Sequence, residues 1–331
     1  MLTAQDIRGL YAILPTPAKT GAGALGALST VDLIETERVV NALIADGSHG
    51  LIALGTTGEC ATLGQADYDS FVACLLEVVN RRVPVFVGTS ALGGHEVVRR
   101  MRFASDRGAD GSLLGLPMWQ PASTAMAVDF YAGISELFPD TAIMVYANER
   151  AFRFAFTDDF WAQVVGRAAT VVAAKYSRPK DLRHLLGIVG GRINIVPNEM
   201  TLAGFYSEAP NTTTACWATA ASMGPWPALA LMQAVLDRDG SAIQRISAAL
   251  AWANETVKPI IGNRELFASY NIQVEKARID AAGYCKAGPV RPPYGEIPAD
   301  MLAAAQECGR RWSVLCANRA TGIAIPDTAA A

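Results

Sequence analysis

The stretch TVVAAKY, residues 170–176, is a short run of small and β-branched residues that ends at Lys175. Such a run is typical of a buried strand, and a lysine at its end would lie against an apolar interior. The ammonium form is poorly solvated there, so we expect a lowered pKa for Lys175 and an available free amine. A neutral amine can attack a ketone and form a Schiff base. The alternative is that Lys175 only reaches out to solvent or pairs with an acid.

The other lysines favour the first interpretation, because only Lys175 ends an apolar run. The remaining five lie in polar segments that have the pattern of loops or helices: Lys19, Lys180, Lys258, Lys276 and Lys286.

Seven further apolar runs resemble the one before Lys175 and are separated by amphipathic segments. Alternation of strands and helices implies parallel pairing with crossover helices, and eight such units are the number in a (β/α)8 TIM barrel. The competing fold is a doubly wound open sheet, which usually carries a glycine-rich phosphate turn after its first strand. Residues 15–17 (PTP) stand there instead, so we predict the barrel. The eight expected strands are residues 11–14, 51–54, 83–87, 112–116, 142–146, 170–174, 193–196 and 213–217.

The expected organisation has three parts. Residues 1–225 form the barrel, residues 226–318 supply its closing helix and a C-terminal helical extension, and residues 319–331 form a disordered tail. Helical spacing of apolar residues is seen at 228–236, 242–257, 274–282 and 299–315.

Composition argues against several classes of partner. The net charge is −3 without a basic block, so we expect neither nucleic acid nor an anionic membrane surface as a partner. No apolar run reaches the roughly 18 residues of a membrane helix, and the first ten residues lack a signal-peptide core. Six scattered cysteines suit a reducing cytoplasm, and three histidines without ligand spacing argue against a metal site.

The segment after the second run, residues 55–59 (GTTGE), has the composition of an anion nest. Its glycines allow a tight turn with exposed N–H groups, and Thr56 and Thr57 add hydroxyl donors. We expect Gly55, Thr56 and Thr57 to bind a carboxylate. A plain turn is the alternative.

Tyr146 ends the fifth run and precedes Lys175 by one βα unit, so the two should lie on neighbouring strands, roughly 5 Å apart. A phenol at that place can move protons for a Schiff-base lysine. A rim tyrosine that bonds to the backbone is the alternative. Trp119, Trp217 and Phe152 follow strand ends and are candidates for an aromatic pocket, or else pack in the core.

Together these motifs resemble the dihydrodipicolinate synthase and N-acetylneuraminate lyase superfamily over about residues 7–318. The resemblance rests on GTTGE, Tyr146 and Lys175 in this order, and on the closing run at 271–276 (NIQVEK) and 287–293 (AGPVRPP). It implies a Schiff base on Lys175, no free cofactor, a keto-acid substrate and a homo-oligomer, usually a tetramer.

Within that superfamily, the hydratase-aldolases of aromatic hydrocarbon breakdown are the most similar subgroup. They act on trans-o-hydroxybenzylidenepyruvate in naphthalene catabolism or on a hydroxynaphthyl analogue in phenanthrene catabolism. The resemblance lies in residues 55–63 (GTTGECATL), 115–119 (GLPMW), 146–148 (YAN) and 270–272 (YNI). It implies hydration of an arylidene pyruvate and retro-aldol cleavage to an aromatic aldehyde and pyruvate. In that reaction Asn148 and Asn271 would orient water or the new hydroxyl, and Trp119 and Trp217 would pack the aryl ring.

Two departures from dihydrodipicolinate synthases favour this subgroup. Residues 118–119 (MW) replace a tyrosine pair, and Ala151 replaces an arginine that holds a second carboxylate, although Arg150 is one residue away. The alternatives are another Schiff-base lyase of the superfamily, dihydrodipicolinate synthase-like or acting on a sugar acid; a non-enzymatic keto-acid sensor or a structural relic; and a metal-dependent aldolase.

Overall fold

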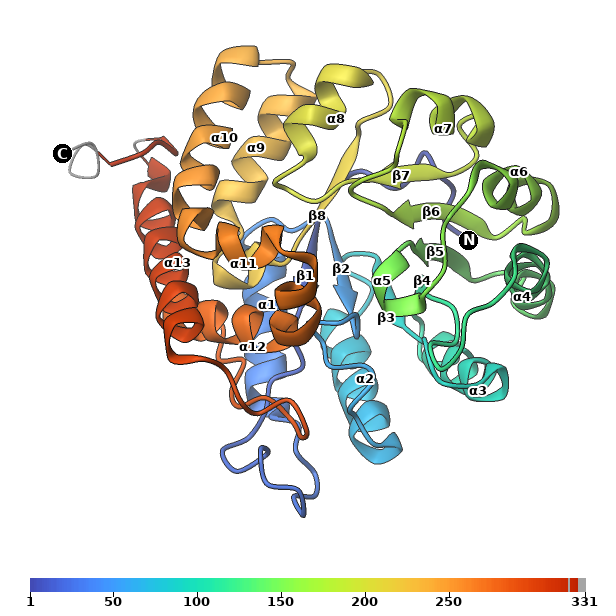
Figure 1. Cartoon of the computed structure of the whole chain (residues 1–331), viewed down its shortest axis with the longest axis horizontal. Helices are drawn as coiled ribbons and strands as arrows, with labels where there is room; N and C mark the ends of the chain where they lie inside the picture. The colour runs from blue at the N-terminus through green and yellow to red at the C-terminus, as the bar shows by residue number, and fades with distance from the viewer. Residues whose placement is uncertain (321, 327–331) are drawn as a thin grey trace.

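Eight parallel strands form the centre of the computed structural model, which describes residues 1–320 and 322–326 (Figure 1). Each of the eight expected runs is a strand, and neighbours in sequence pair in parallel from β1 to β7 while β8 returns to β1. Between β7 and β8 the barrel is closed by a bridge between Asn198 and Trp217. The strands are β1 (Gly9–Leu14), β2 (Gly50–Ala53), β3 (Val85–Gly88), β4 (Gly111–Leu114), β5 (Ala142–Tyr146), β6 (Val171–Lys175), β7 (Asn194–Val196) and β8 (Ala215–Ala218). The predicted TIM barrel is confirmed.

Helices surround the strands and cover their outer faces (Figure 1). Several begin at residues whose side chains accept a backbone N–H of the first turn, such as Asp32, Thr157 and Asp181. α9 packs on β1 and β8 and completes the ring. The helices of the barrel are α1 (Leu33–Ala45), α2 (Gln65–Val79), α3 (Gly94–Ser105), α4 (Thr124–Leu137), α5 (Glu149–Phe152), α6 (Asp158–Arg167), α7 (Leu182–Val189), α8 (Leu202–Glu208) and α9 (Trp226–Leu236).

The C-terminal extension contains four helices: α10 (Gly240–Asn254), α11 (Lys258–Gly262), α12 (Arg264–Ala282) and α13 (Ala299–Ala317). Short 3-10 turns, η1 (Ala220–Met223), η2 (Glu255–Val257) and η3 (Asn318–Ala320), link the parts of this region. The helix expected at 274–282 starts ten residues earlier, at Arg264. Tyr270 interrupts its first half with non-helical backbone angles (φ −124°, ψ 15°), although Leu266 and Tyr270 pack on the same apolar cluster as Val274.

The disordered tail was expected to begin at residue 319, but residues 319, 320 and 322–326 are described by the structure. Residues 318–320 form η3, Ile323 is 4% exposed, and its carbonyl accepts a hydrogen bond from Arg245 at 2.6 Å. Residues 321 and 327–331 of the expected tail lie outside the described residues. Within the described ranges, no helix is long and apolar enough to cross a membrane.

Candidate active site

Lys175 is the last residue of β6, and its side chain is only 9% exposed. Its Nζ lies 3.3 Å from the ring centroid of Trp217 and 4.6 Å from that of Tyr146. In the described part of the chain, Nζ has neither a hydrogen bond nor an ion pair. Burial lowers the pKa of Lys175 to about 7, although the charges of Glu199 and Glu275 oppose this. About half of the amine is therefore neutral at pH 7, as the position of Lys175 at a strand end predicted.

Tyr146 lies beside Lys175, because the two residues are register partners on β5 and β6. Its hydroxyl is 2.8 Å from Thr56 Oγ1 and accepts a hydrogen bond of 3.4 Å from Asn148 Nδ2. Burial raises the pKa of Tyr146 above its usual value, so the phenol stays protonated at neutral pH. The group can therefore pass a proton between Thr56 and a reacting oxygen near Lys175.

The GTTGE segment turns tightly after β2 and brings both threonines into the cavity that contains Lys175. The turn needs Gly58, since a Cβ there would lie 2.7 Å from backbone atoms of Leu54. Glu59 closes the turn in the left-handed region (φ 55°) with a hydrogen bond from its N–H to the Thr56 carbonyl at 2.9 Å.

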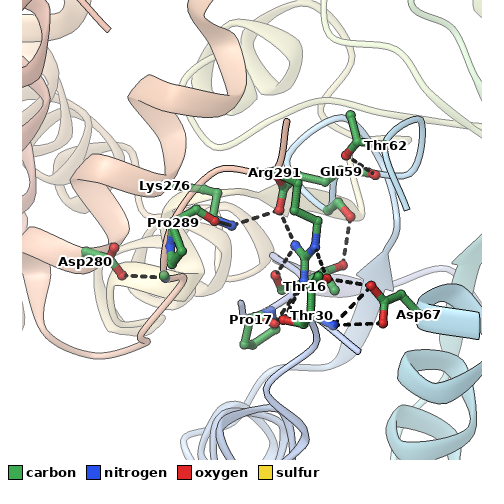
Figure 2. A network of polar contacts seen from close by, with 12 residues as sticks. Thr16, Pro17, Thr30, Glu59, Thr62, Asp67, Lys276, Asp280, Pro289 and Arg291 are labelled. Carbon is green, nitrogen blue, oxygen red and sulfur yellow. Dashed lines mark hydrogen bonds and ion pairs between the residues drawn. The ribbon is translucent and has the colours of Figure 1, made fainter. Parts of the chain in front are cut away.

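Glu59, the last residue of this turn, is held in a buried ion network with Lys276 and Arg291 (Figure 2). Glu59, 1% exposed, accepts hydrogen bonds from Lys276 Nζ at 2.8 Å, from the Arg291 N–H at 2.7 Å and from the Arg291 guanidinium. Lys276 also donates to the Pro289 carbonyl, and Arg291 to the Thr16 carbonyl. Lys276 does lie in a polar segment of a helix, as expected, but its side chain is 1% exposed and pairs with Glu59, which the sequence did not show. The network connects the predicted carboxylate nest to the closing run of the sequence.

The cavity has a volume of about 470 Å³ and opens at the carboxyl ends of the strands. Trp217 and Asn271 line it, and each has a buried polar atom, Nε1 and Oδ1 respectively, without a hydrogen-bond partner. Buried polar atoms are normally paired, so these two mark a place for a water molecule or a substrate group. Asn148 also lines the cavity, and its Oδ1 caps α5 through the Ala151 N–H at 3.1 Å.

Comparison with known proteins identifies the family. Residues 24–152 match the model of the dihydrodipicolinate synthetase family. A trans-O-hydroxybenzylidenepyruvate hydratase-aldolase from Pseudomonas aeruginosa is 40% identical over 327 residues, which cover 96% of this chain and 95% of the relative. The chain belongs to this family, among its hydratase-aldolases. It is therefore a carbon–carbon lyase, as the resemblance predicted.

Two further relatives support the same branch. A trans-2'-carboxybenzalpyruvate hydratase-aldolase from Nocardioides sp. strain KP7 is 34% identical, covering 94% of this chain and 95% of the relative. The solved structure of PhdJ bound to a substrate intermediate is 35% identical, with a TM-score of 0.92, covering 96% of this chain and 98% of that one.

The structure brings most of the expected site residues of this hydratase-aldolase together, but not all of the aromatic ones. Trp119 is 78% exposed and does not line the cavity of its own chain. Phe152 is buried and packs its ring edge-on against Tyr146 at 5.3 Å, so it supports the phenol and does not line the cavity. Of the three expected aromatic residues, Trp217 alone lines the cavity, together with Tyr146, Tyr176 and Phe267.

Sequence reasoning missed several charged residues in the cavity of this hydratase-aldolase. Glu199 follows β7 and is 5% exposed, and burial raises its pKa to about 7. Glu199 lies three residues after the seventh apolar run, and that position at a strand end is the signal that predicts it. Four arginines line the cavity: Arg150, which the sequence analysis left open, and Arg178, Arg264 and Arg278, which it missed. Ala151 does not line the cavity but the neighbouring Arg150 does, so the replacement at 151 does not leave the cavity without an arginine.

Proposed function

We propose that this enzyme converts an arylidene pyruvate, such as trans-o-hydroxybenzylidenepyruvate or a polycyclic analogue, to an aromatic aldehyde and pyruvate in aromatic hydrocarbon catabolism. The observation that carries the proposal is the buried, unpaired amine of Lys175 beside the Tyr146 phenol. No free cofactor takes part, because the Schiff base on Lys175 supplies the electron sink. A homotetramer is part of the proposal, and light scattering checks it.

The reaction begins with the substrate carboxylate in the nest at Thr56 and Thr57. The neutral amine of Lys175 attacks the ketone carbon, and the carbinolamine loses water to give an iminium ion. The neutral fraction of the amine at pH 7 makes this step feasible without prior deprotonation. The iminium withdraws electrons through the conjugated double bond, which makes the benzylic carbon electrophilic.

Hydration follows at the benzylic carbon. Trp217 and Asn271 both line the cavity, and their unpaired Nε1 and Oδ1 atoms offer one donor and one acceptor for the attacking water. Its oxygen bonds to the benzylic carbon, and one of its protons is released. The neighbouring carbon takes up a proton, and the iminium is restored. Asn148, through its hydrogen bond to the Tyr146 hydroxyl, orients the phenol toward the new hydroxyl group.

Cleavage then breaks the carbon–carbon bond. Tyr146 with Thr56 accepts the proton of the benzylic hydroxyl, the aldehyde leaves, and the electron pair of the broken bond moves into the iminium to form an enamine. Protonation of the enamine and hydrolysis release pyruvate and regenerate Lys175.

The test mixes the purified protein with trans-o-hydroxybenzylidenepyruvate, follows the conjugated absorbance and assays pyruvate in the same tube. We expect matched loss of absorbance and gain of pyruvate, together with borohydride trapping of pyruvate on Lys175. The Lys175→Ala variant is the control and should show neither. Trapping of pyruvate without turnover would overturn the proposed substrate and leave another Schiff-base lyase of the superfamily.

A further inference from the structure

Glu199 lies in the wall of the cavity and has no role in the reaction above. It follows β7, it is 5% exposed, and it lines the same cavity as Lys175. Within residues 1–320 and 322–326, no other residue forms a hydrogen bond or an ion pair with its carboxyl group. Buried polar groups are normally paired, so an unpaired carboxyl in a cavity wall is available to a reacting group.

Glu199 and Tyr146 lie on different sides of the Lys175 amine. Tyr146 ends β5 and Lys175 ends β6, and Glu199 comes three residues after the end of β7, the next strand of the barrel (Figure 1). The Glu199 N–H donates to the carbonyl of Trp217 on β8 at 3.1 Å, and the Trp217 ring lies against Lys175 Nζ. The phenol thus reaches the amine from the β5 side, whereas the carboxyl belongs to the side of β7 and β8.

The charges around Glu199 leave its carboxyl free to exchange a proton. They come from Lys175 on β6 and from Glu275 and Arg278 on α12. Arg278 already pairs with Glu275 at 2.6 Å, so it does not need Glu199 as a counterion. Burial raises the pKa of Glu199 to about 7, and the charges of Arg278 and Lys175 oppose this. Both the acid and the base form are therefore present at pH 7.

The groups that would hold the attacking water belong to the elements around Glu199. Trp217 Nε1 and Asn271 Oδ1 are buried and unpaired, and both residues line the cavity. Trp217 is bonded to the Glu199 backbone, and Asn271 lies about one turn before Glu275 on α12. Hydration takes a proton from the water and adds one to the neighbouring carbon, and this transfer needs a carrier.

We propose that Glu199 carries the proton of the hydration step from the water to the carbon next to the iminium carbon. The inference rests on the proposed function. As the water oxygen bonds to the benzylic carbon, the carboxylate takes one of its protons, and the electrons of the double bond move into the iminium to form an enamine. The protonated carboxyl then gives this proton to the neighbouring carbon, which restores the iminium and the carboxylate. Tyr146 keeps the cleavage step, so the two steps use different proton carriers.

The first test uses pyruvate alone and does not depend on the arylidene substrate. In pyruvate bound to Lys175 the same carbon is the methyl group, and reversible transfer of a methyl proton to Glu199 exchanges it with D2O. Proton NMR follows the loss of the methyl signal. In Glu199→Gln we expect this exchange to slow about 10²-fold or more, while borohydride still traps pyruvate on Lys175. The matched control is Glu208→Gln, an exposed position on α8, which should exchange like the wild type.

The second test separates hydration from cleavage. Glu199→Gln should slow the loss of conjugated absorbance of trans-o-hydroxybenzylidenepyruvate about 10²-fold. In a single turnover, its release of salicylaldehyde from the hydrated intermediate, 4-hydroxy-4-(2-hydroxyphenyl)-2-oxobutanoate, should stay within about 3-fold of the wild type, because Tyr146 is intact. Tyr146→Phe should slow that release. Equal slowing of hydration and aldehyde release in Glu199→Gln would overturn the role of Glu199.

The exchange experiment also separates failure of this role from failure of the proposed reaction. Wild-type methyl exchange in Glu199→Gln, or no exchange in a wild type that traps pyruvate, would overturn the role. Exchange that depends on Glu199, in a protein that leaves the arylidene pyruvate unchanged, would overturn the reaction and keep the carrier. If Glu199→Gln traps no pyruvate, Glu199→Asp is compared with Glu199→Asn. The Asp variant should exchange at least about 10-fold faster per trapped pyruvate, and equal rates would overturn the role.

Discussion

Replacement of Lys175 by methionine should make the protein more stable while it abolishes Schiff-base formation. Methionine has a similar length and no charge, and it can keep the contact with the Trp217 ring. The native amine is 9% exposed and has no hydrogen bond in the described part of the chain. The ammonium form of Lys175 is therefore poorly solvated in the folded protein.

The magnitude follows from proton linkage. Burial lowers the pKa of Lys175 from 10.5 to about 7 in the folded protein. At pH 7 the unfolded chain holds the proton fully and the folded chain only by about half, so protonation of Lys175 favours unfolding. The two pKa values give a destabilisation of about 4 kcal/mol at pH 7 and about 1 kcal/mol at pH 10. Stability should thus rise with pH in the wild type through the window between the two pKa values.

The assay is urea unfolding of wild type and Lys175→Met at pH 7 and pH 10, at equal protein concentration. The variant should gain most at pH 7, and the difference should shrink toward pH 10. Borohydride with pyruvate should label only the wild type, which shows that the variant has lost the amine, and a cooperative urea transition of the variant shows that it keeps the fold. A variant that is less stable at pH 7, or a difference that does not change with pH, would refute the linkage argument.

Two further substitutions test the surroundings of the amine. Tyr146→Phe should lower kcat by about 10² with an unchanged circular dichroism spectrum, because the proton carrier is lost and the ring remains; a nearly normal kcat would remove Tyr146 from that role. Glu59→Gln should lower the free energy of unfolding by about 3 kcal/mol in urea, because Lys276 and Arg291 stay buried without their counter-charge. The double variant Glu59→Gln/Lys276→Met should recover part of that loss, and a loss that is additive would show that the two residues do not interact.

The fold was predictable because the barrel repeats one local pattern eight times. Strand ends also gave Lys175, Tyr146 and the threonine nest, since chemistry gathers at the carboxyl ends of the strands. The register of β5 and β6 places Tyr146 and Lys175 directly opposite each other. These residues are determined by short-range periodicity and strand order, which a single sequence displays.

Other features depend on distance and burial, which periodicity does not encode. Nothing in the polar segment around Lys276 shows that it is covered by residues 287–293 and paired with Glu59, 217 positions earlier. Trp119 and Trp217 both lie near the ends of strands in the sequence. Trp119 is exposed, however, whereas the Trp217 ring lies against the amine of Lys175. Trp217 belongs to β8, whereas Trp119 lies in the segment that follows β4, and the position of a residue after a strand end depends on packing that the local sequence does not contain.

The irregular first half of α12 explains why the C-terminal extension belongs to the active site. Arg264, Phe267 and Asn271 all line the cavity, and each lies within about two turns of the kink at Tyr270. Lys276, one turn further along the same helix, is fixed to Glu59 beneath the threonine nest. The first half of α12 thus places side chains in the lining of the cavity, and its second half holds the turn after β2 through the contact between Lys276 and Glu59. In the proposed reaction the barrel would supply the nucleophile and the proton carrier and Asn271 of α12 would help to hold the water, so residues of the barrel and of the extension would act in one cavity.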